Sequence, residues 1–164
     1  MHVREMNDSD IPGAARLLEA LAREYIVHDC TAEQASTFIR DNDAAALRRL
    51  VDSGFVYHVA DVKGEVAGFV GVRERRHLYH LFVAKRYHGQ GIARVLWEHA
   101  RQAAAPDDPF ATFTVNSSLF ATGVYESFGF VRSGPEQCVN GLRFLAMTLN
   151  ELPAIRQGGA ATGC

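Results

Sequence analysis

The chain has 164 residues, of which 48% are hydrophobic and 22% are charged, and its formal net charge at pH 7 is −2. This length and apolar content suit one globular domain with a sizeable core. The weak net charge, with arginines dispersed among acids, predicts no nucleic-acid binding. No apolar run approaches the length that crosses a bilayer and the N-terminus lacks the pattern of a signal peptide, so we expect a cytoplasmic protein without a membrane partner.

The first third of the chain is predicted to form a short strand followed by helices. Residues 1–6 alternate in polarity, and residues 11–25 place apolar side chains at helical spacing around Pro12, which suits the first turn of a helix. Two shorter helices are predicted between residues 31 and 51, because Asp41-Asn42-Asp43 is typical of a break between helices.

The middle and the end of the chain alternate between strands and helices. Residues 55–62, 65–72 and 77–84 have the composition of strands, and Lys63-Gly64 suits a hairpin turn, so an antiparallel meander is predicted. The period becomes helical from Ile92 to Ala103. Further strands are predicted at 110–115, 128–133 and 142–152, with a helix from Ser117 or Ser118 to Phe128. We expect residues 1–152 to form one domain and the Gly-rich residues 153–164 to form a disordered tail.

The cysteines predict neither a disulfide framework nor a metal site. Cys30, Cys138 and Cys164 are odd in number, widely separated and outside any Cys-x-x-Cys spacing. His77 and His80 are three residues apart on a predicted strand, so they would point to opposite faces and make a poor metal pair. We therefore expect free thiols and no bound metal.

The turn Gly89-Gln90-Gly91 lies between a predicted strand and a predicted helix. The free backbone N–H groups of a helix's first turn can bind an anion, and glycine lets a phosphate approach them closely. A Walker loop would need Gly-Lys-Ser/Thr where this chain has Gly91-Ile92-Ala93, and a dinucleotide fingerprint would need a small residue where it has Arg94. From these residues alone, an ordinary turn without function stays open.

A second motif extends this pattern. The run Arg86-Tyr87-His88-Gly89-Gln90-Gly91 matches Arg/Gln-x-x-Gly-x-Gly/Ala, and a later segment places Asn116 at the end of a strand and Tyr125 shortly before Gly129-Phe130. In both motifs the chain resembles the GCN5-related N-acetyltransferases, over about residues 56–149. The resemblance implies an α/β fold with a mixed, mostly antiparallel sheet, two splayed central parallel strands and helices on both faces.

The resemblance also implies the ligands. Members of this family transfer an acetyl group from acetyl-CoA to an amine, so we expect acetyl-CoA as cosubstrate, without a metal. The pantetheine arm would pair with the strand backbone, and the pyrophosphate would bind the amides of the turn. The residues implied at the coenzyme are Leu81, Phe82, Val83, Arg86, Tyr87, His88, Gly89, Gln90, Gly91, Ile92, Ala93, Asn116 and Tyr125.

Two proton transfers define the catalytic candidates. Tyr125 is the expected general acid, because a phenol with an ordinary pKa of about 10 can protonate the departing thiolate. A base must take a proton from the amine, and His77 is the first candidate, His80 the second and Glu74 the third. No acid lies between Glu74 and Tyr87, so a histidine or ordered water would have to serve. Strand alternation puts His77 and His80 on opposite faces unless a β-bulge intervenes.

Other functions and the acceptor stay open in the sequence. A catalytically silent domain that binds coenzyme A as a sensor is the main alternative, and a nucleotide-dependent enzyme is another. The acceptor is not readable from the sequence, although the N-terminal helices should contribute to its pocket, with Tyr25, His28 and Asp29 as positional guesses. Arg73, Arg75 and Arg76 are read as a solvated basic turn or as ligands of an acceptor carboxylate. An edge strand near the C-terminus would permit a homodimer.

Overall fold

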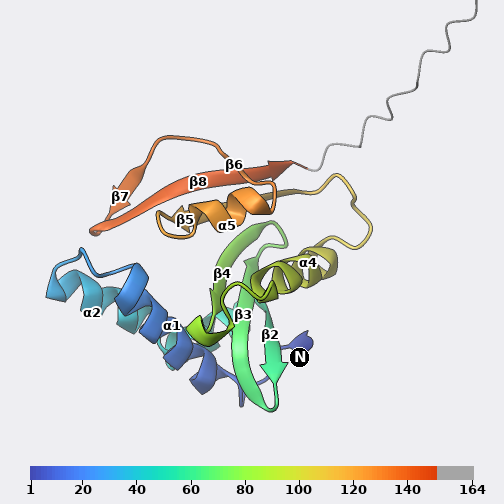
Figure 1. The fold of residues 1–164 in the computed structure, drawn as a ribbon, viewed down its shortest axis with the longest axis horizontal. Coiled ribbons are helices and arrows are strands. Elements are labelled where there is room, and N and C mark those ends of the chain that lie inside the picture. Colours follow the sequence, from blue (N-terminus) through green and yellow to red (C-terminus); the bar gives the residue numbers. More distant parts are fainter. Residues whose placement is uncertain (151–164) are drawn as a thin grey trace, which may run out of the picture.

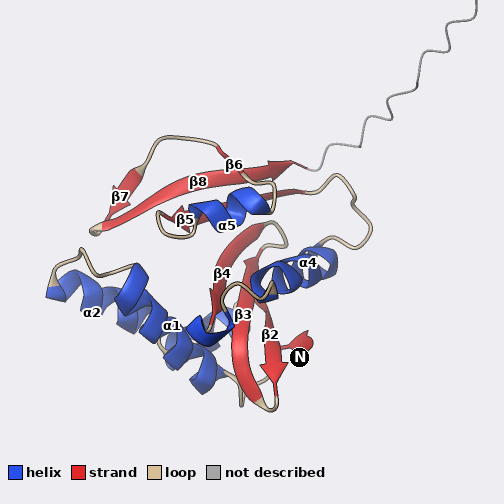
Figure 2. Ribbon diagram, viewed as in Figure 1, coloured by secondary structure: helices blue, strands red, loops and turns tan. Residues whose placement is uncertain are grey.

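The structure is a computed structural model, described here for residues 1–150, in which helices flank an eight-stranded sheet (Figures 1 and 2). The strands are β1 (His2–Glu5), β2 (Val56–Val62), β3 (Glu65–Arg73), β4 (His77–Val83), β5 (Thr112–Ser118), β6 (Val131–Arg132), β7 (Gln137–Val139) and β8 (Leu142–Asn150). The helices are α1 (Ile11–Tyr25), α2 (Ala32–Asp41), α3 (Ala44–Asp52), α4 (Ile92–Ala104) and α5 (Thr122–Ser127), with a 3-10 turn at Lys85–Tyr87. The last two residues of the predicted domain and the predicted tail at 153–164 lie outside the described residues.

The sheet has the strand order β1-β2-β3-β4-β5-β8-β6, and β7 pairs with β8. Every pairing is antiparallel except that of β4 with β5. That parallel pair is in register only at His77–Thr114 and Leu78–Val115, so the rest of β4 has no partner on its β5 side. Figure 1 shows β1 to β4 below and β5 to β8 above this junction. The predicted α/β fold with splayed central parallel strands is confirmed.

A β-bulge interrupts β4 at Tyr79. Gly71 of β3 pairs with His80 and the next residue, Val72, pairs with Leu78, so Tyr79 has no partner on β3. The extra residue changes which face the following side chains occupy. Leu78 packs in the core on the α4 face, whereas the ring of His80 lies near Phe69 in the core on the α1 face. Simple alternation would have placed Leu78 and His80 on the same face.

Two apolar cores cover the two faces of the sheet. On one face α4 packs its apolar side against the strands, with Leu96, Trp97 and Phe113 almost fully buried. On the other face α1 and α3 pack Leu18 and Leu47 against the sheet. Burial of large apolar side chains on both sides holds the central strands in place and so positions the opening between β4 and β5.

The later elements differ from prediction at their ends. The fifth strand runs on to Ser118, because Ser117 is fully buried and pairs with Leu145 of β8, so the following helix begins only at Thr122. Strand β7 was not predicted from its three exposed residues. Within residues 1–150, every helix is too short or too polar to cross a bilayer.

Candidate active site

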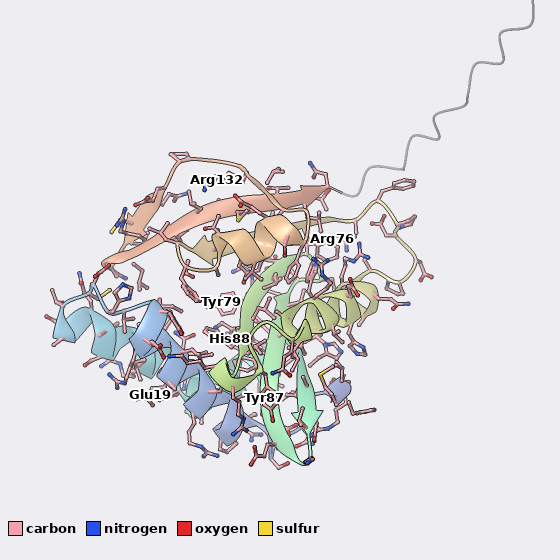
Figure 3. All side chains as sticks on the ribbon, viewed as in Figure 1. Glu19, Arg76, Tyr79, Tyr87, His88 and Arg132 are labelled. Carbon is pink, nitrogen blue, oxygen red and sulfur yellow. The ribbon has the colours of Figure 1, made fainter. Side chains whose placement is uncertain are left out.

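A cavity of about 520 Å³ opens where β4 and β5 separate. Its walls come from α1, α2, β4, the turn after β4, the start of α4, β5, α5 and β8. Figure 3 shows two of its residues, Tyr79 and His88, in the space between α1 and the β5–β8 part of the sheet. Segments far apart in the sequence therefore meet at the point where the sheet is incomplete.

Residues 81–93 form one side of the cavity, which we call the backbone wall. Gly89 and Gly91 have φ angles of +74° and +78°, which side chains with a Cβ rarely adopt. A Cβ added at either glycine would meet no atom within 4 Å, so the space in front of the turn is open. Gly91 is the N-cap of α4 and provides no side-chain cap, which leaves N–H groups of the first helical turn without a side-chain acceptor.

Side chains around the turn hold its shape. His88 Nε2 donates to the carbonyl oxygen of Val83 at 2.7 Å, and Gln90 Nε2 donates to the carbonyl oxygen of Arg86 at 3.1 Å. Arg86 forms an ion pair with Glu65. Arg86 and Gln90 do not line the cavity, whereas the other residues expected at the coenzyme do: Leu81, Phe82, Val83, Tyr87, His88, Gly89, Gly91, Ile92, Ala93, Asn116 and Tyr125. The groups of this wall that could bind an anion are therefore its backbone N–H groups, aided by the dipole of α4.

The second half of β4 offers backbone groups on its open side. Leu81, Phe82 and Val83 pair with β3 on one side, while the pairing with β5 stops at Leu78. An unpaired strand edge presents N–H and C=O groups that an extended amide-containing ligand can bind. The edge leads directly into the glycine turn.

Tyr125 lies on α5 and reaches the same cavity. Its side chain is 6% exposed and packs against the rings of Phe128 and Phe130, with centroid distances of 6.2 and 5.8 Å. Burial raises the pKa of the Tyr125 phenol, so the hydroxyl stays protonated at neutral pH. No hydrogen bond joins this hydroxyl to another residue within 1–150, which leaves it available to a ligand in the cavity.

His80 lines the cavity but both of its ring nitrogens are occupied. The Asn42 amide nitrogen donates to the Phe38 carbonyl at 2.9 Å, so its Oδ1 faces His80 and accepts from Nε2 at 3.0 Å. Nδ1 then accepts from the Tyr57 hydroxyl at 2.9 Å. Burial lowers the pKa of His80 to about 3, which keeps the ring neutral.

His77 and Glu74, the other predicted base candidates, do not line the cavity. His77 Nδ1 lies 2.7 Å from Thr114 Oγ1, and burial, followed by the charge of Arg73, lowers the pKa of the imidazole. Glu74 is in the turn between β3 and β4, with a φ angle of +51°. The structure therefore brings Tyr125 and His80 to one cavity and leaves His77 beside it.

Five aromatic side chains outside residues 81–93 also line the cavity, and we call this set the aromatic wall: Tyr25, Phe38, Tyr79, Phe120 and Phe144. Of these, only Tyr25 was expected at the acceptor. The others come from α2, the bulge, the loop after β5 and β8, and no local pattern marks them. His28 and Asp29 do not line the cavity, and they form an ion pair with each other at 3.2 Å.

Other residues singled out in the sequence also lie away from the cavity. Arg76 pairs with Asp108 at 2.9 Å, and Arg75 Nε donates to the Ala104 carbonyl. Among the described residues Cys30 and Cys138 are free thiols, and Cys164 lies outside the described range.

Known proteins resemble the chain in sequence and in fold. The sequence profile of the acetyltransferase (GNAT) domain matches residues 26–151. The human protein N-acetyltransferase 8B is 34% identical over 97 residues, which cover 52% of this chain and 42% of that protein. The chain thus spans about two fifths of the length of this curated relative.

Two solved structures share the fold. A GCN5-related N-acetyltransferase from Rhodopseudomonas palustris has a TM-score of 0.74 and 21% identity, over 91% of this chain and 94% of that one. The PaiA N-acetyltransferase from Thermoplasma acidophilum, solved with coenzyme A, has a TM-score of 0.72 and 14% identity, over 91% and 98% of the two chains. The family suggested by the two sequence motifs is confirmed by the profile match.

Proposed function

The chain belongs to the GNAT acetyltransferase family, and we propose that it transfers the acetyl group of acetyl-CoA to a primary amine of a small molecule or protein. One observation carries this proposal: the glycine turn, the unpaired edge of β4 and the protonated Tyr125 hydroxyl all face one cavity. A solved relative of the same fold carries coenzyme A, which supports acetyl-CoA as the donor.

The backbone wall suits the two polar parts of coenzyme A. Its pyrophosphate would accept hydrogen bonds from amides between Gly89 and Ala93, and the space in front of Gly89 and Gly91 is open to it. The amide-containing pantetheine arm would pair with β4 along Leu81–Val83 as an added strand. Asn116, near the end of the pairing of β5 with β8, also lines the cavity and would contact the coenzyme.

The reaction joins the amine nitrogen to the thioester carbonyl carbon. The C–N bond forms first and gives a tetrahedral intermediate, whose oxyanion a backbone N–H near Phe82 would stabilise. The C–S bond then breaks, and the thiolate of coenzyme A takes the proton of the Tyr125 hydroxyl. The nitrogen loses two protons in all, one from the ammonium to a base before attack and one from the tetrahedral intermediate to water, and Tyr125 regains its own proton from solvent. The products are the N-acetylated acceptor and free coenzyme A.

The base is His80 or a water held in the cavity. An alkyl amine with a pKa of about 10 is mostly protonated at pH 7 and must lose a proton before it attacks. His80 reaches the cavity, but the Tyr57 hydroxyl occupies its Nδ1 and burial lowers its pKa to about 3, which makes water the stronger candidate. His77 could act only through water, because it does not line the cavity. If His80 is the base, His80→Gln lowers kcat by about 100-fold or more, whereas a water base leaves it within about tenfold.

The Tyr125→Phe variant tests the proposed acid. We expect turnover to fall by about 100-fold, the loss typical of a missing general acid. The Kd of acetyl-CoA, measured by calorimetry, should stay within about twofold, because the ring and its packing are kept. Phe110→Leu, which changes an exposed aromatic outside the cavity, serves as the control and should keep wild-type turnover. An unchanged turnover in Tyr125→Phe removes this residue from the mechanism.

A catalytically silent coenzyme sensor is distinguished by the same assays. Such a protein would bind acetyl-CoA in calorimetry but release no coenzyme A thiol with any amine. Failure to bind acetyl-CoA at all, while ATP or NAD binds, would overturn both readings.

A further inference from the structure

The aromatic wall leaves large rings uncovered inside a concave site. Phe120 is 57% exposed and Tyr79 is 40% exposed, although both line the cavity. The β-bulge is the reason Tyr79 points there, because it removes this residue from the pairing with β3. Covering exposed aromatic surface with an apolar group of a ligand lowers the free energy of the complex.

The same cavity lacks negative charge. Among the described residues that line it, none is an aspartate or a glutamate. His80 is neutral at physiological pH, since burial lowers its pKa to about 3. Arg143 is the one arginine or lysine in this lining, and its partner Glu136 does not line the cavity. An ammonium group that moved from water into this part of the site would find no carboxylate to compensate its lost hydration.

Aromatic faces can also bind cations, but one aromatic pair in this cavity, Tyr25 and Phe120, already has a cation beside it. Tyr25 and Phe120 stack on each other, with ring centroids 4.1 Å apart and planes 16° apart. Lys85 Nζ lies 5.9 Å from the centroid of the Tyr25 ring. Lys85 in turn forms an ion pair with Glu24, so the Tyr25 face already has a cation with its own counter-ion, and a second cation would gain little there.

We propose that the acceptor is a monoamine that carries an aromatic or bulky apolar group and no second positive charge. The reacting amine lies at the thioester, and its apolar body covers Tyr79, Phe120 and the rest of the aromatic wall. Polyamines and aminosugars with several ammonium groups are poor acceptors for this site. This inference rests on the proposed acetyl transfer and narrows its substrate class.

The test compares amines in the presence of acetyl-CoA and follows the release of coenzyme A thiol by the full chain. The probes are 2-phenylethylamine, ethylamine, spermidine and kanamycin. We expect kcat/KM for 2-phenylethylamine to exceed that for ethylamine by about 50-fold, because the phenyl ring is buried on binding. It should exceed that for spermidine and for kanamycin by at least about tenfold, because their additional charges have no partner.

A charge introduced into the aromatic wall should change this preference. Phe120→Glu places a carboxylate in the cavity at an exposed position, so the fold should tolerate it. We expect kcat/KM for 2-phenylethylamine to fall and that for spermidine to rise, each by about tenfold. Phe110→Glu is the matched control, because it adds the same charge at a residue that is 58% exposed and does not line the cavity. It should keep the wild-type preference.

The outcomes separate this inference from the proposed function. If spermidine or kanamycin is acetylated faster than 2-phenylethylamine, or if Phe120→Glu and Phe110→Glu behave alike, the proposed acceptor class is wrong while acetyl transfer stands. If acetyl-CoA binds but no amine releases thiol, the transfer itself is wrong and the acceptor class falls with it.

Discussion

The two sets of residues that line the cavity present different chemistry to a ligand. The backbone wall offers N–H and C=O groups from β4 and from the turn before α4. The aromatic wall offers side chains from α1, α2, β4, the loop after β5 and β8. Recognition by backbone groups requires glycine where the chain has positive φ, so it can be recognised in the sequence as a glycine motif. Recognition by side chains from five segments produces no such motif, which is why the sequence did not identify the acceptor.

The largest effect is expected from damage to the backbone wall. Gly91→Val puts a β-branched residue at a φ of +78° and fills the open space in front of the turn. Loss of two charge-assisted hydrogen bonds from the amides costs about 3 kcal/mol, so we expect the Kd of acetyl-CoA to rise by more than about 100-fold. Calorimetry with acetyl-CoA measures this change.

The control for that variant is Gly134→Val. Gly134 has no atom within 4 Å of an added Cβ and no positive φ, and it does not line the cavity. It should bind acetyl-CoA as the wild type does. Equal affinities for Gly91→Val and the wild type would show that the turn does not bind the coenzyme. The proposed division of the cavity into a backbone wall for the coenzyme and an aromatic wall for the acceptor would then be wrong.

A smaller effect is expected from the histidine behind the aromatic wall. Burial lowers the pKa of His80 from 6.5 to about 3, so as pH falls below 6.5 the unfolded chain binds a proton that folded His80 does not. The free energy of unfolding should therefore drop by about 2 kcal/mol between pH 7 and pH 5 on account of His80 alone, and the loss should level off near pH 3. Urea unfolding at several pH values measures it.

Two variants isolate the contribution of His80. His80→Gln removes the titrating ring, and its amide can still donate to Asn42. The drop in the free energy of unfolding between pH 7 and pH 5 should therefore be smaller by about 2 kcal/mol. Burial also lowers the pKa of His58, whose contribution remains in both proteins. His2→Gln, at an exposed position of β1, is the matched His-to-Gln control. An identical pH dependence in His80→Gln would mean that His80 is not held neutral in the fold.

The smallest effect is expected in α5, beside the acid. Gly123 lies inside this helix, has no atom within 4 Å of an added Cβ and does not line the cavity. Gly123→Ala should raise the free energy of unfolding by up to about 1 kcal/mol, since alanine has the higher helix propensity. Urea unfolding at pH 7 measures this gain, and acetyl-CoA affinity should not change. A weaker affinity would instead show that a ligand needs the space above this glycine.

Sequence reasoning located the glycine turn for a physical reason. Gly89 and Gly91 were singled out because glycine lets a phosphate approach the backbone between a strand and a helix, and in the structure both adopt positive φ. The positions of the strand before the turn and the helix after it follow from their periodicity, which local side-chain patterns record. Tyr125 was singled out by the family motif, and the structure places it on the cavity.

Sequence reasoning could not predict how β4 divides its side chains between the two faces. The bulge at Tyr79 depends on the pairing with Gly71 and Val72, more than five residues away in the chain. His77 therefore ranked above His80 as a candidate base, although only His80 lines the cavity. Asn42 was read as part of a break between helices, and its hydrogen bond to His80 appears only when α2 packs against β4.

The sequence by itself determined the elements, the family and the glycine turn, because helical period, strand alternation and positive-φ glycines are local properties of the chain. Only the tertiary structure decided the contents of the cavity. It brought Tyr25, Phe120 and Phe144 from three distant segments to one wall and left that wall without a described carboxylate. Residues far apart in a chain become neighbours through packing and strand register, and no single segment of the sequence determines either of these.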